Sequence, residues 1–309
     1  MSAAVKQVAT LFGVQAGFAT SSTPLAQVLP LTLSPNSIRA ACQEVAEEVL
    51  RQESDLISAS QSLQHQTATQ RHLTAPQCVY GSLDGFQAPF DDGWHELKAG
   101  VFWTVDDKGH ATNKHYFVDT VSADAFAPMV WAKGWQYGAD LAERLIFSAD
   151  GSVWIWRMAQ TLFPNAIQSV DWYHASAYLA KIAAEAFGEG TPLAKTWYDQ
   201  QATRLYEGHL AALMRACRAI HAQAPIASDA ARRYFANNRT RLPYPKYRAL
   251  GLQIGSGVME SACKQIGLLR LKLPGARWSK VGARKLAKAR AAFLSDKANF
   301  APFSLLQVA

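Results

Sequence analysis

The sequence predicts an α/β protein whose five-stranded sheet is partly antiparallel and partly parallel. Three apolar segments between residues 79 and 121 are separated by turn residues, which predicts an antiparallel meander. Helical and strand-like segments then alternate as far as residue 170, as they do where crossover helices join parallel strands. Apolar residues at helical spacing predict helices before residue 76 and after residue 174.

The N-terminal region, residues 1–75, is expected to be mostly helical. Ser34-Pro35 is a typical helix start, because proline is favoured in the first turn of a helix. The predicted helix carries an apolar stripe formed by Ile38, Cys42, Val45 and Val49. Residues 61–72 are polar, which predicts a linker or an exposed helix.

The predicted meander consists of strands at 79–83, 97–105 and 115–121. The first strand is expected to end at Asp84-Gly85, and residues 106–109 form a hairpin turn between the second and third. The elements that follow are a helix at 124–136, a strand at 144–149, a helix at 152–163 and a strand at 166–170.

The C-terminal half is predicted to be helical. Residues 175–238 form an all-helical block that Pro243 and Pro245 are expected to break. A further helix is predicted at 258–266, after the turn 255–257. The last helix starts at Ser279, and its predicted inner face carries Val281, Leu286 and Phe293.

The composition excludes several classes of protein. Of 309 residues, 49% are hydrophobic and 18% are charged, a balance that excludes a disordered chain and allows a large core. No run of 18 apolar residues occurs, so we expect no membrane-spanning helix. The four cysteines form no CxxC pair, so neither a zinc ribbon nor a disulfide framework is expected, and a reducing cytoplasm fits.

Positive charge is concentrated towards the C-terminus. The formal net charge is +7, and residues 232–290 contain fifteen Lys or Arg but a single acid, Glu260. Such a run is often only a solvated helix face. Here aromatic residues lie among the cations, a mixture that favours nucleic-acid binding. These aromatic residues are Tyr234, Phe235, Tyr244, Tyr247 and Trp278.

Three acids stand at positions that suit metal binding. Asp84 and Asp150 follow the first and fourth predicted strands, which are expected to be neighbours in the sheet, and Glu260 lies in the first turn of a late helix. Clustered carboxylates need a counter-charge, which Mg²⁺ or Mn²⁺ can supply, and two such ions support phosphoryl transfer. The alternative is that each Asp-Gly pair is an ordinary turn.

Asp171 and His174 follow the fifth predicted strand. A lone histidine there is commonly a structural hydrogen-bonding group, and the functional alternative is that it orients a site carboxylate or contacts the scissile phosphate. The segment 255–260 ends in glutamate where a dinucleotide-binding motif has Gly or Ala, and it lies outside any βαβ unit. No nucleotide cofactor is therefore expected.

Three sequence blocks carry a family resemblance. LDGFQAPFDDGWHELKAGVFW, FSADGSVWIWRMAQTLFPNAIQSVDWYH and IGSGVMESACKQIGLLRLKLPGARWS occur in this order. Together they resemble the ISKra-type bacterial insertion-sequence transposases, relatives of the Mutator-like DDE enzymes. The resemblance covers residues 79–294, about two-thirds of the chain.

The resemblance implies an RNase H-like core that a helical insertion interrupts before the last catalytic acid. Asp84, Asp150 and Glu260 match the metal-binding acids, while Asp171 and His174 match a D-x-x-H signature. The implied organisation is a helical N-terminal region that could be the remnant of a DNA-binding or dimerisation domain, a first core segment, a helical insertion, and a final segment with Glu260 and the basic C-terminus. These parts span residues 1–75, 76–174, 175–245 and 246–309.

The implied activity is DNA transposition. Water attacks the phosphodiester at the element end, and the freed 3′-OH then joins target DNA, with two Mg²⁺ or Mn²⁺ ions as the cofactor. Paired ends imply a homodimer or larger assembly, in the cytoplasm on the nucleoid. The expected DNA contacts are Arg270, Lys272, Arg277, Trp278, Lys280, Arg284 and Lys285.

Two alternatives stay open. A transposase-derived protein that binds DNA without cutting it is favoured by the short region, about 75 residues, before the core. An RNase H-like nuclease would cut strands but never join them. A glycosidase is disfavoured by the basic C-terminal segment.

Overall fold

The computed structural model describes residues 1–296 except 29, 64, 68, 72 and 256. It is an α/β structure with a mixed, open five-stranded sheet in the order β3-β2-β1-β4-β5. The strands are β1 (Cys78–Phe90), β2 (Gly93–Val105), β3 (Ala111–Asp119), β4 (Arg144–Ala149) and β5 (Ile167–Val170). None of the described helices has the length and apolar character needed to cross a membrane.

Along the chain, helices precede, separate and follow the strands. Three precede the sheet: α1 (Ala3–Gln15), α2 (Phe18–Val28) and α3 (Pro35–Ser62). Two lie between strands: α4 (Ala123–Tyr137) and α5 (Val153–Leu162). The others are α6 (Trp172–Phe187), α7 (Pro192–Tyr206), α8 (Leu210–Ala219), α9 (Pro225–Asn237), η1 (Arg239–Arg241), α10 (Tyr244–Ala249), α11 (Gly257–Cys263), the π-helical η2 (Lys264–Leu271) and α12 (Lys280–Ser295).

The chain divides into two compact units, each described by itself below. Unit 1 comprises Met1–Leu145 and Gly257–Ala309, and unit 2 comprises Ile146–Ser256. Unit 1 therefore contains the meander together with the helices at both ends of the chain, and unit 2 contains the helices α5 to α10.

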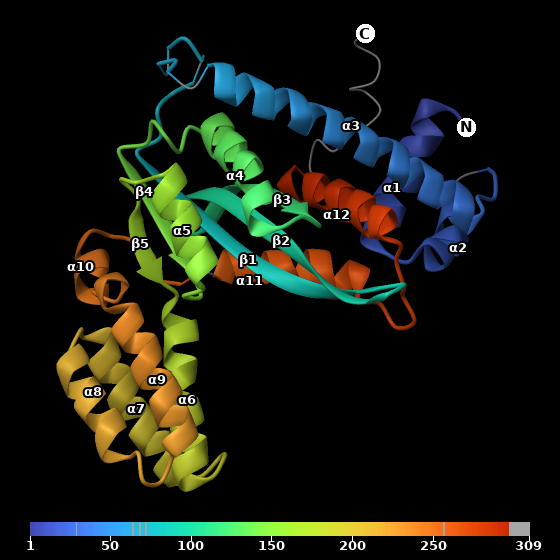
Figure 1. Ribbon diagram of the computed structural model, residues 1–309. Coiled ribbons are helices and arrows are strands. Elements are labelled where there is room, and N and C mark those ends of the chain that lie inside the picture. The colour runs from blue at the N-terminus through green and yellow to red at the C-terminus, as the bar shows by residue number, and fades with distance from the viewer. Residues whose placement is uncertain (29, 64, 68, 72, 256, 297–309) are drawn as a thin grey trace. The chain divides into compact units, whose positions relative to one another are not determined.

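The meander of unit 1 has helices on both of its faces (Figure 1). Strand β1 pairs antiparallel with β2, and β2 with β3. Side chains alternate between the faces of a strand. On one face, a side-chain atom added at Gly100 would meet Phe117, whose ring contacts Phe126 of α4. On the other face, Phe86 lies so close to Gly267 of η2 that a Cβ there would meet its ring at 2.8 Å.

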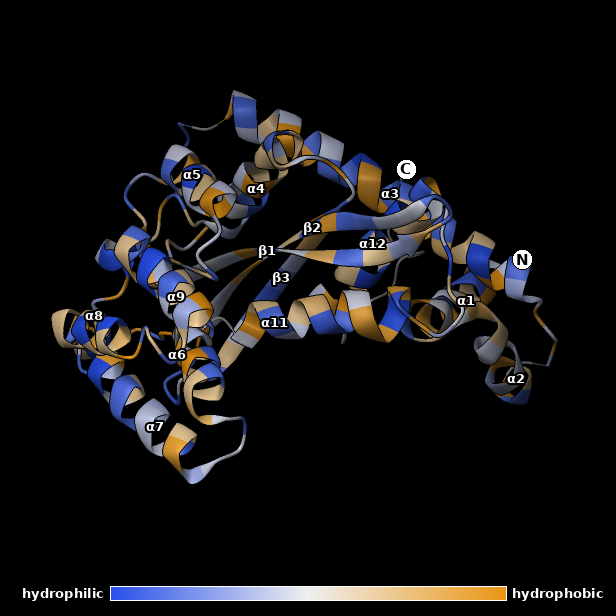
Figure 2. Ribbon diagram, turned by 60° about the horizontal axis from the view of Figure 1, so that its bottom comes forward, coloured by the Kyte–Doolittle hydropathy of each residue, from blue (hydrophilic) through white to orange (hydrophobic). Residues whose placement is uncertain are grey.

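The long helix α3 covers α4 and α12. Ser34 caps its start by accepting a hydrogen bond from the Ser37 amide, as the Ser-Pro pair predicts. Hydrophilic and hydrophobic residues alternate along α3 (Figure 2), as expected of a helix with one buried side. Ile38, Cys42 and Val45 are buried, so the predicted stripe is confirmed at these positions.

A buried network of charges joins α3, β3 and α12. Lys288 is 1% exposed and forms ion pairs with Glu53 of α3 and, at 3.0 Å, with Asp119 of β3. Arg284 donates two hydrogen bonds to the same Asp119, at 2.7 and 3.0 Å. These charges lose their hydration on folding, and only mutual pairing offsets that cost.

Unit 2 combines a parallel strand pair with a group of helices. Ile146–Ala149 pairs with Ile167–Val170. Ser152 stands at the N-cap of α5, and Asp171 caps α6 by accepting a hydrogen bond from the His174 amide. The helices α6 to α9 pack on one another around buried residues such as Leu179, Leu213 and Phe235.

The structure corrects several predicted boundaries. Strand β1 does not end at Asp84 but continues to Phe90, because Asp84 pairs with Ala99 in an unbroken ladder. Pro245 does not break a helix; it lies in the first turn of α10, where the missing N–H costs nothing. Val281 is not on the inner face of α12, because its side chain is 62% exposed.

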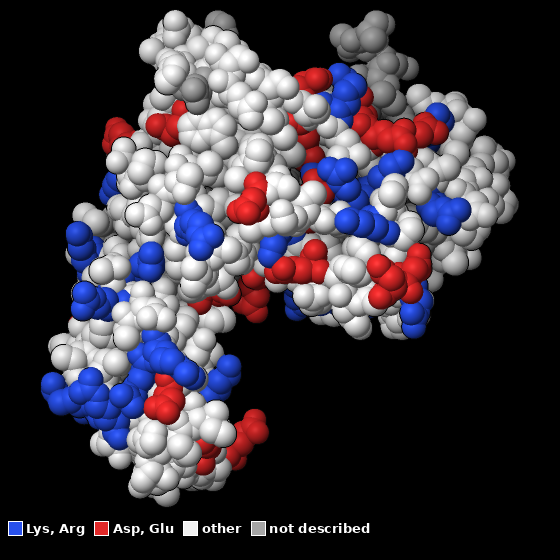
Figure 3. All heavy atoms as spheres, in the orientation of Figure 1, with Lys and Arg blue, Asp and Glu red and all other residues white. Residues whose placement is uncertain are grey.

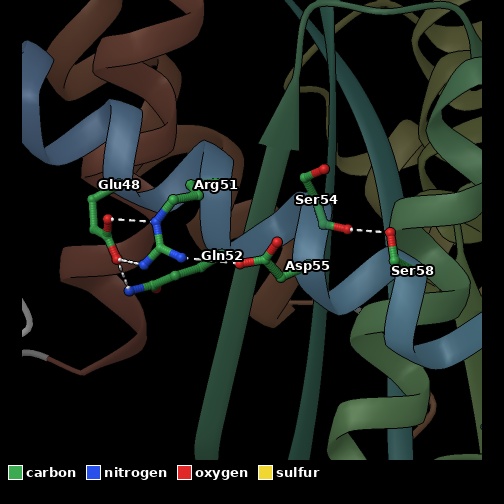
Figure 4. Close-up of polar contacts among 6 residues, drawn as sticks. All are labelled: Glu48, Arg51, Gln52, Ser54, Asp55 and Ser58. Carbon is green, nitrogen blue, oxygen red and sulfur yellow. Dashed lines mark hydrogen bonds and ion pairs between the residues drawn. The ribbon is translucent and has the colours of Figure 1, made fainter. Parts of the chain in front are cut away.

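We predict that neutralising Glu53 destabilises the protein far more than neutralising its exposed neighbour Asp55. Glu53→Gln leaves the buried Lys288 without one counter-ion, at a cost of about 3 kcal/mol. Asp55 pairs with Arg51 on the surface of α3 (Figure 4), and Asp55→Asn should cost at most about 0.5 kcal/mol. Urea unfolding measures both, and equal losses would contradict the role given to the network.

The network also predicts a loss of stability in acid. Burial alone would raise the pKa of Asp119, but the hydrogen bonds from Arg284 and the charge of Lys288 outweigh it and hold that pKa below its ordinary value of 3.8. The contribution of Asp119 to the free energy of unfolding is therefore complete above pH 3.8, and it is lost as the pH falls through the folded-state pKa.

The measurement compares the unfolding free energies of the wild type and Asp119→Asn between pH 6 and pH 3. The gap between them should narrow as the pH falls below about 4. A gap that stays constant over this range would show that the Asp119 carboxylate is not preferentially ionised in the folded state.

Candidate functional site

Asp84 lies in the middle of β1, on the face that α11 covers. Its Oδ1 accepts a hydrogen bond of 2.7 Å from the Gly85 amide, and its Oδ2 accepts one of 3.5 Å from the Cys263 thiol of α11. The carboxylate is half-buried. A Cβ at position 85 would lie 2.0 Å from the carboxylate of Glu96, so a larger residue there would require the Glu96 side chain to move.

The charges of Asp84 and Glu260 both affect the pKa of the Cys263 thiol. Glu260 is exposed in the first turn of α11, and Cys263 lies one turn later on that helix. The pKa of Cys263 is raised, chiefly by burial, then by the charge and hydrogen bond of Asp84 and least by the charge of Glu260, while the charge of Lys272 opposes the shift. Asp84 thus contacts the thiol directly, whereas Glu260 lies one turn before Cys263 on α11.

Asp150 directly follows β4 in unit 2. Its two carboxylate oxygens accept hydrogen bonds from the amide and the hydroxyl of Ser152, at 2.8 and 2.9 Å. Its backbone carbonyl accepts a bond of 2.8 Å from the Tyr234 hydroxyl. Gly151 has a φ of +106°, and a Cβ at this position would lie 2.7 Å from the Tyr234 ring. The turn that presents Asp150 thus depends on glycine.

Asp171 is a buried helix cap. Its Oδ1 accepts a hydrogen bond of 2.6 Å from the His174 amide, and its own amide donates to the Ala149 carbonyl. Capping α6 accounts for the aspartate in structural terms. His174 is exposed, with its ring 6.0 Å from those of Tyr178 and Tyr234.

A pair of stacked tyrosines, which no motif of the sequence predicts, borders Asp150. The rings of Tyr178 and Tyr234 are 4.1 Å apart and inclined by 20°. The pKa of Tyr234 is raised by burial first, and then by Tyr178 and the nearby carboxylates. Tyr178 and Tyr234 lie on different helices, α6 and α9, so no local pattern could reveal their contact.

Four of the five predicted nucleic-acid aromatics are core residues. Tyr234, Phe235, Tyr244 and Tyr247 are each at most 9% exposed, so they cannot stack on bases. Trp278 is half-buried and donates a hydrogen bond of 2.8 Å from its indole nitrogen to the Leu271 carbonyl. The spacing of these rings among arginines reflects helix packing.

The cations that are predicted to contact DNA differ in how exposed they are and in whether they pair with acids. Arg270 is 1% exposed and donates a hydrogen bond to the Gly13 carbonyl, which contradicts a DNA contact for this side chain. Arg284 and Lys285 form ion pairs with Asp119 and Glu47. Lys272 lies over the Trp94 ring. Arg277 and Lys280 are exposed.

Exposed cations gather on unit 2, where the sequence analysis had only partly placed them. Clusters of Lys and Arg lie among uncharged residues and a few acids on the visible side of α8, α9 and α10 (Figure 3). Unit 2 contains twelve Lys or Arg and seven Asp or Glu. The exposed cations of this surface are Arg215, Arg218, Arg233, Arg239, Lys246 and Arg248.

The site residues thus fall into two groups. In unit 1, Asp84 contacts Cys263 and Glu260 lies one turn before Cys263 on α11, and unit 2 places Asp150 and His174 beside the stacked tyrosines. Within the described part of the chain, no three His, Cys, Asp or Glu side chains form a group that could hold a metal ion. In the comparisons with known proteins, the sequence matches no family model and no curated protein.

We predict that Gly151→Ala destabilises unit 2 by about 2 kcal/mol or more, because it adds a clash with Tyr234 to the strain of a positive φ. Gly190→Ala is the matched control: its φ is +75°, but nothing lies within 4 Å of the added atom. Thermal unfolding should show that the control loses about 1 kcal/mol of unfolding free energy. Equal losses would mean that the contact with Tyr234 is easily relieved.

Proposed function

We propose that the protein is a metal-dependent DNA phosphoryl-transfer enzyme of the insertion-sequence transposase type that its sequence resembles. The proposed catalytic carboxylates are Asp84 and Glu260 of unit 1 and Asp150 of unit 2. In this proposal His174 contacts the scissile phosphate and Asp171 holds the start of α6, so that its contribution is to position His174.

The observation that carries the proposal is the placement of Asp84 and Glu260 near Cys263. Asp84 contacts the Cys263 thiol, and Glu260, 176 residues after Asp84, lies one helical turn before Cys263 on α11. Carboxylates near one buried thiol repel one another, and the charge of Lys272 offsets part of that repulsion. A bound cation would remove the repulsion.

The donor set suits a hard divalent cation. Carboxylate oxygens are the ligands that Mg²⁺ and Mn²⁺ prefer. The hydrogen bond from Cys263 to Asp84 is long, 3.5 Å, so Oδ2 can be given up to a metal at little cost. Asp150 keeps acceptor capacity beyond its two bonds from Ser152. Two such ions would activate the attacking oxygen and stabilise the leaving one.

The basic surface of unit 2 supports DNA as the substrate. The exposed cations on α8 to α10 face few acids, since unit 2 contains twelve Lys or Arg and seven Asp or Glu (Figure 3). A surface of this kind binds a phosphate backbone without regard to sequence, and its affinity falls with salt. Pairing of two DNA ends calls for a homodimer or larger assembly on the nucleoid.

The test is Mg²⁺-dependent nicking of DNA that carries the element ends. Asp84→Ala, Asp150→Ala and Glu260→Ala should each reduce the nicking rate by at least about 100-fold, because each removes a ligand for the ions that stabilise developing charge. Asp107→Ala, in the exposed hairpin turn between β2 and β3, is the control and should leave the rate unchanged. Equal nicking by the wild type and Asp150→Ala would remove Asp150 from the mechanism.

The same substrate separates the alternatives. A transposase-derived DNA-binding protein retains salt-sensitive binding but shows no nicking in the wild type. A nuclease nicks but does not join a pre-cut 3′-OH end to a second DNA, whereas the proposed enzyme does both.

A further inference from the structure

A pocket of about 830 Å³ lies within unit 1, away from Asp84 and Glu260. It is formed by the junction of α1 and α2, the first turns of α3, and the segment from the end of η2 into α12. The contact of α1 with η2 brings these segments, from opposite ends of the sequence, side by side (Figure 1). Its volume is that of a site for a small organic ligand.

The lining of the pocket is positively charged. It includes Arg39, Arg270 and Arg277 but no Asp or Glu, although the chain has 24 acids. Arg39 and Arg277 are exposed, and no acidic side chain of the described residues pairs with either. Arg51, three turns further along α3, is by contrast neutralised by Glu48 and Asp55 (Figure 4).

The third arginine is buried without a counter-ion. Arg270 donates to the Gly13 carbonyl and its neighbour Arg290 to the Val14 carbonyl, both at the end of α1. The Nη2 of Arg270 is buried with no hydrogen-bond partner among the described residues. Burial, with a smaller contribution from the charge of Arg290, lowers the pKa of Arg270 to about 10. Positive charge at the pocket wall is thus left uncompensated, a costly state that a bound anion would relieve.

Two helix N-termini reinforce this preference. Pro35 and Asn36 in the first turn of α3, and Ser279 at the cap of α12, all line the pocket. The positive end of the helix dipole makes such termini favourable for anions, while the capping hydroxyls of Ser34 and Ser279 already accept hydrogen bonds from the Ser37 and Gly282 amides.

The pocket also offers a surface for a planar apolar group. Phe18 and Trp278 both line it, and their rings meet edge to face at 6.2 Å. The guanidinium of Arg270 lies 4.6 Å from the Phe18 ring and 5.5 Å from the Trp278 ring. Leu273 and Pro274 complete an apolar wall.

From these observations we propose that the pocket binds a single nucleotide, with its phosphate between Arg39 and Arg277 and its base against the wall that Trp278 and Phe18 form. The chemistry recognised is a phosphate attached to a flat ring, either as a free mononucleotide or as one residue of a DNA strand. The proposal stands independently of the metal-dependent activity, because it involves none of the three catalytic acids.

The test is isothermal titration of the full-length protein, without divalent metal, with deoxyadenosine 5′-monophosphate, deoxyadenosine, inorganic phosphate and a single-stranded ten-residue oligonucleotide. The mononucleotide or the oligonucleotide should bind, and deoxyadenosine and phosphate should bind at least about tenfold more weakly. Arg39→Gln and Arg277→Gln should each weaken nucleotide binding about tenfold, since each removes a charged hydrogen bond to phosphate. Arg51→Gln is the matched control and should bind as the wild type does.

The outcomes are distinct. Binding of the mononucleotide identifies a free nucleotide site, and binding of the oligonucleotide alone identifies a site for a residue within a strand, provided that Arg39→Gln weakens it. No binding of either, or equal binding by the wild type and the Arg39→Gln/Arg277→Gln double variant, overturns the proposal. Because both arginines are exposed, circular dichroism should show unchanged folding. If no nucleotide binds but the protein still nicks DNA, the pocket proposal is wrong and the proposed DNA-cutting activity is unaffected.

Discussion

The ion pairs of Lys288 with Glu53 and Asp119 bind three segments of unit 1 that the sequence keeps far apart. A lysine that is 1% exposed is tolerated only where carboxylates replace the water it has lost, so α12 can occupy only the register that places Lys288 between them. Arg284, one turn earlier in α12, also forms an ion pair with Asp119 and so requires the same position of the helix. Hydrophobic packing alone would allow α12 to slide or rotate, whereas this set of charges specifies one arrangement of α3, β3 and α12.

The arrangement has consequences at two places. With α4 and α12 on one face of the meander, the other face of β1 is left to α11 and η2, where Phe86 packs on Gly267 and Asp84 meets Cys263. At its two ends, α12 also contributes Ser279 to the positively charged pocket and Arg290 to the end of α1. The helix that the network fixes therefore supports both the carboxylate pair and the pocket.

The sequence predicts the elements and the neighbours within the sheet, β1 beside β4 included, but not which side chains meet across elements. Ser34, Ser279 and the 106–109 turn act through neighbouring residues, so their patterns were sufficient to place helix starts and a hairpin. The end of the first strand was misplaced because Asp-Gly is a common turn pair, and only the ladder with β2 shows that the chain continues. Arg270 and the aromatic residues of 234–247 were assigned to DNA because composition cannot distinguish an exposed cation or ring from a buried one. The position of α11 beside Asp84 is expected only through the resemblance and the predicted topology.

The central proposal is that Asp84 and Glu260 serve the same metal ions. Its most direct test is Mn²⁺ binding to the full-length protein with DNA present, measured by electron paramagnetic resonance for the wild type, Asp84→Asn, Glu260→Gln and the double variant. Shared ions predict that each single change weakens binding strongly and that the double variant is little worse than either. Independent, additive losses, or Mn²⁺ binding that neither substitution alters, would contradict the account.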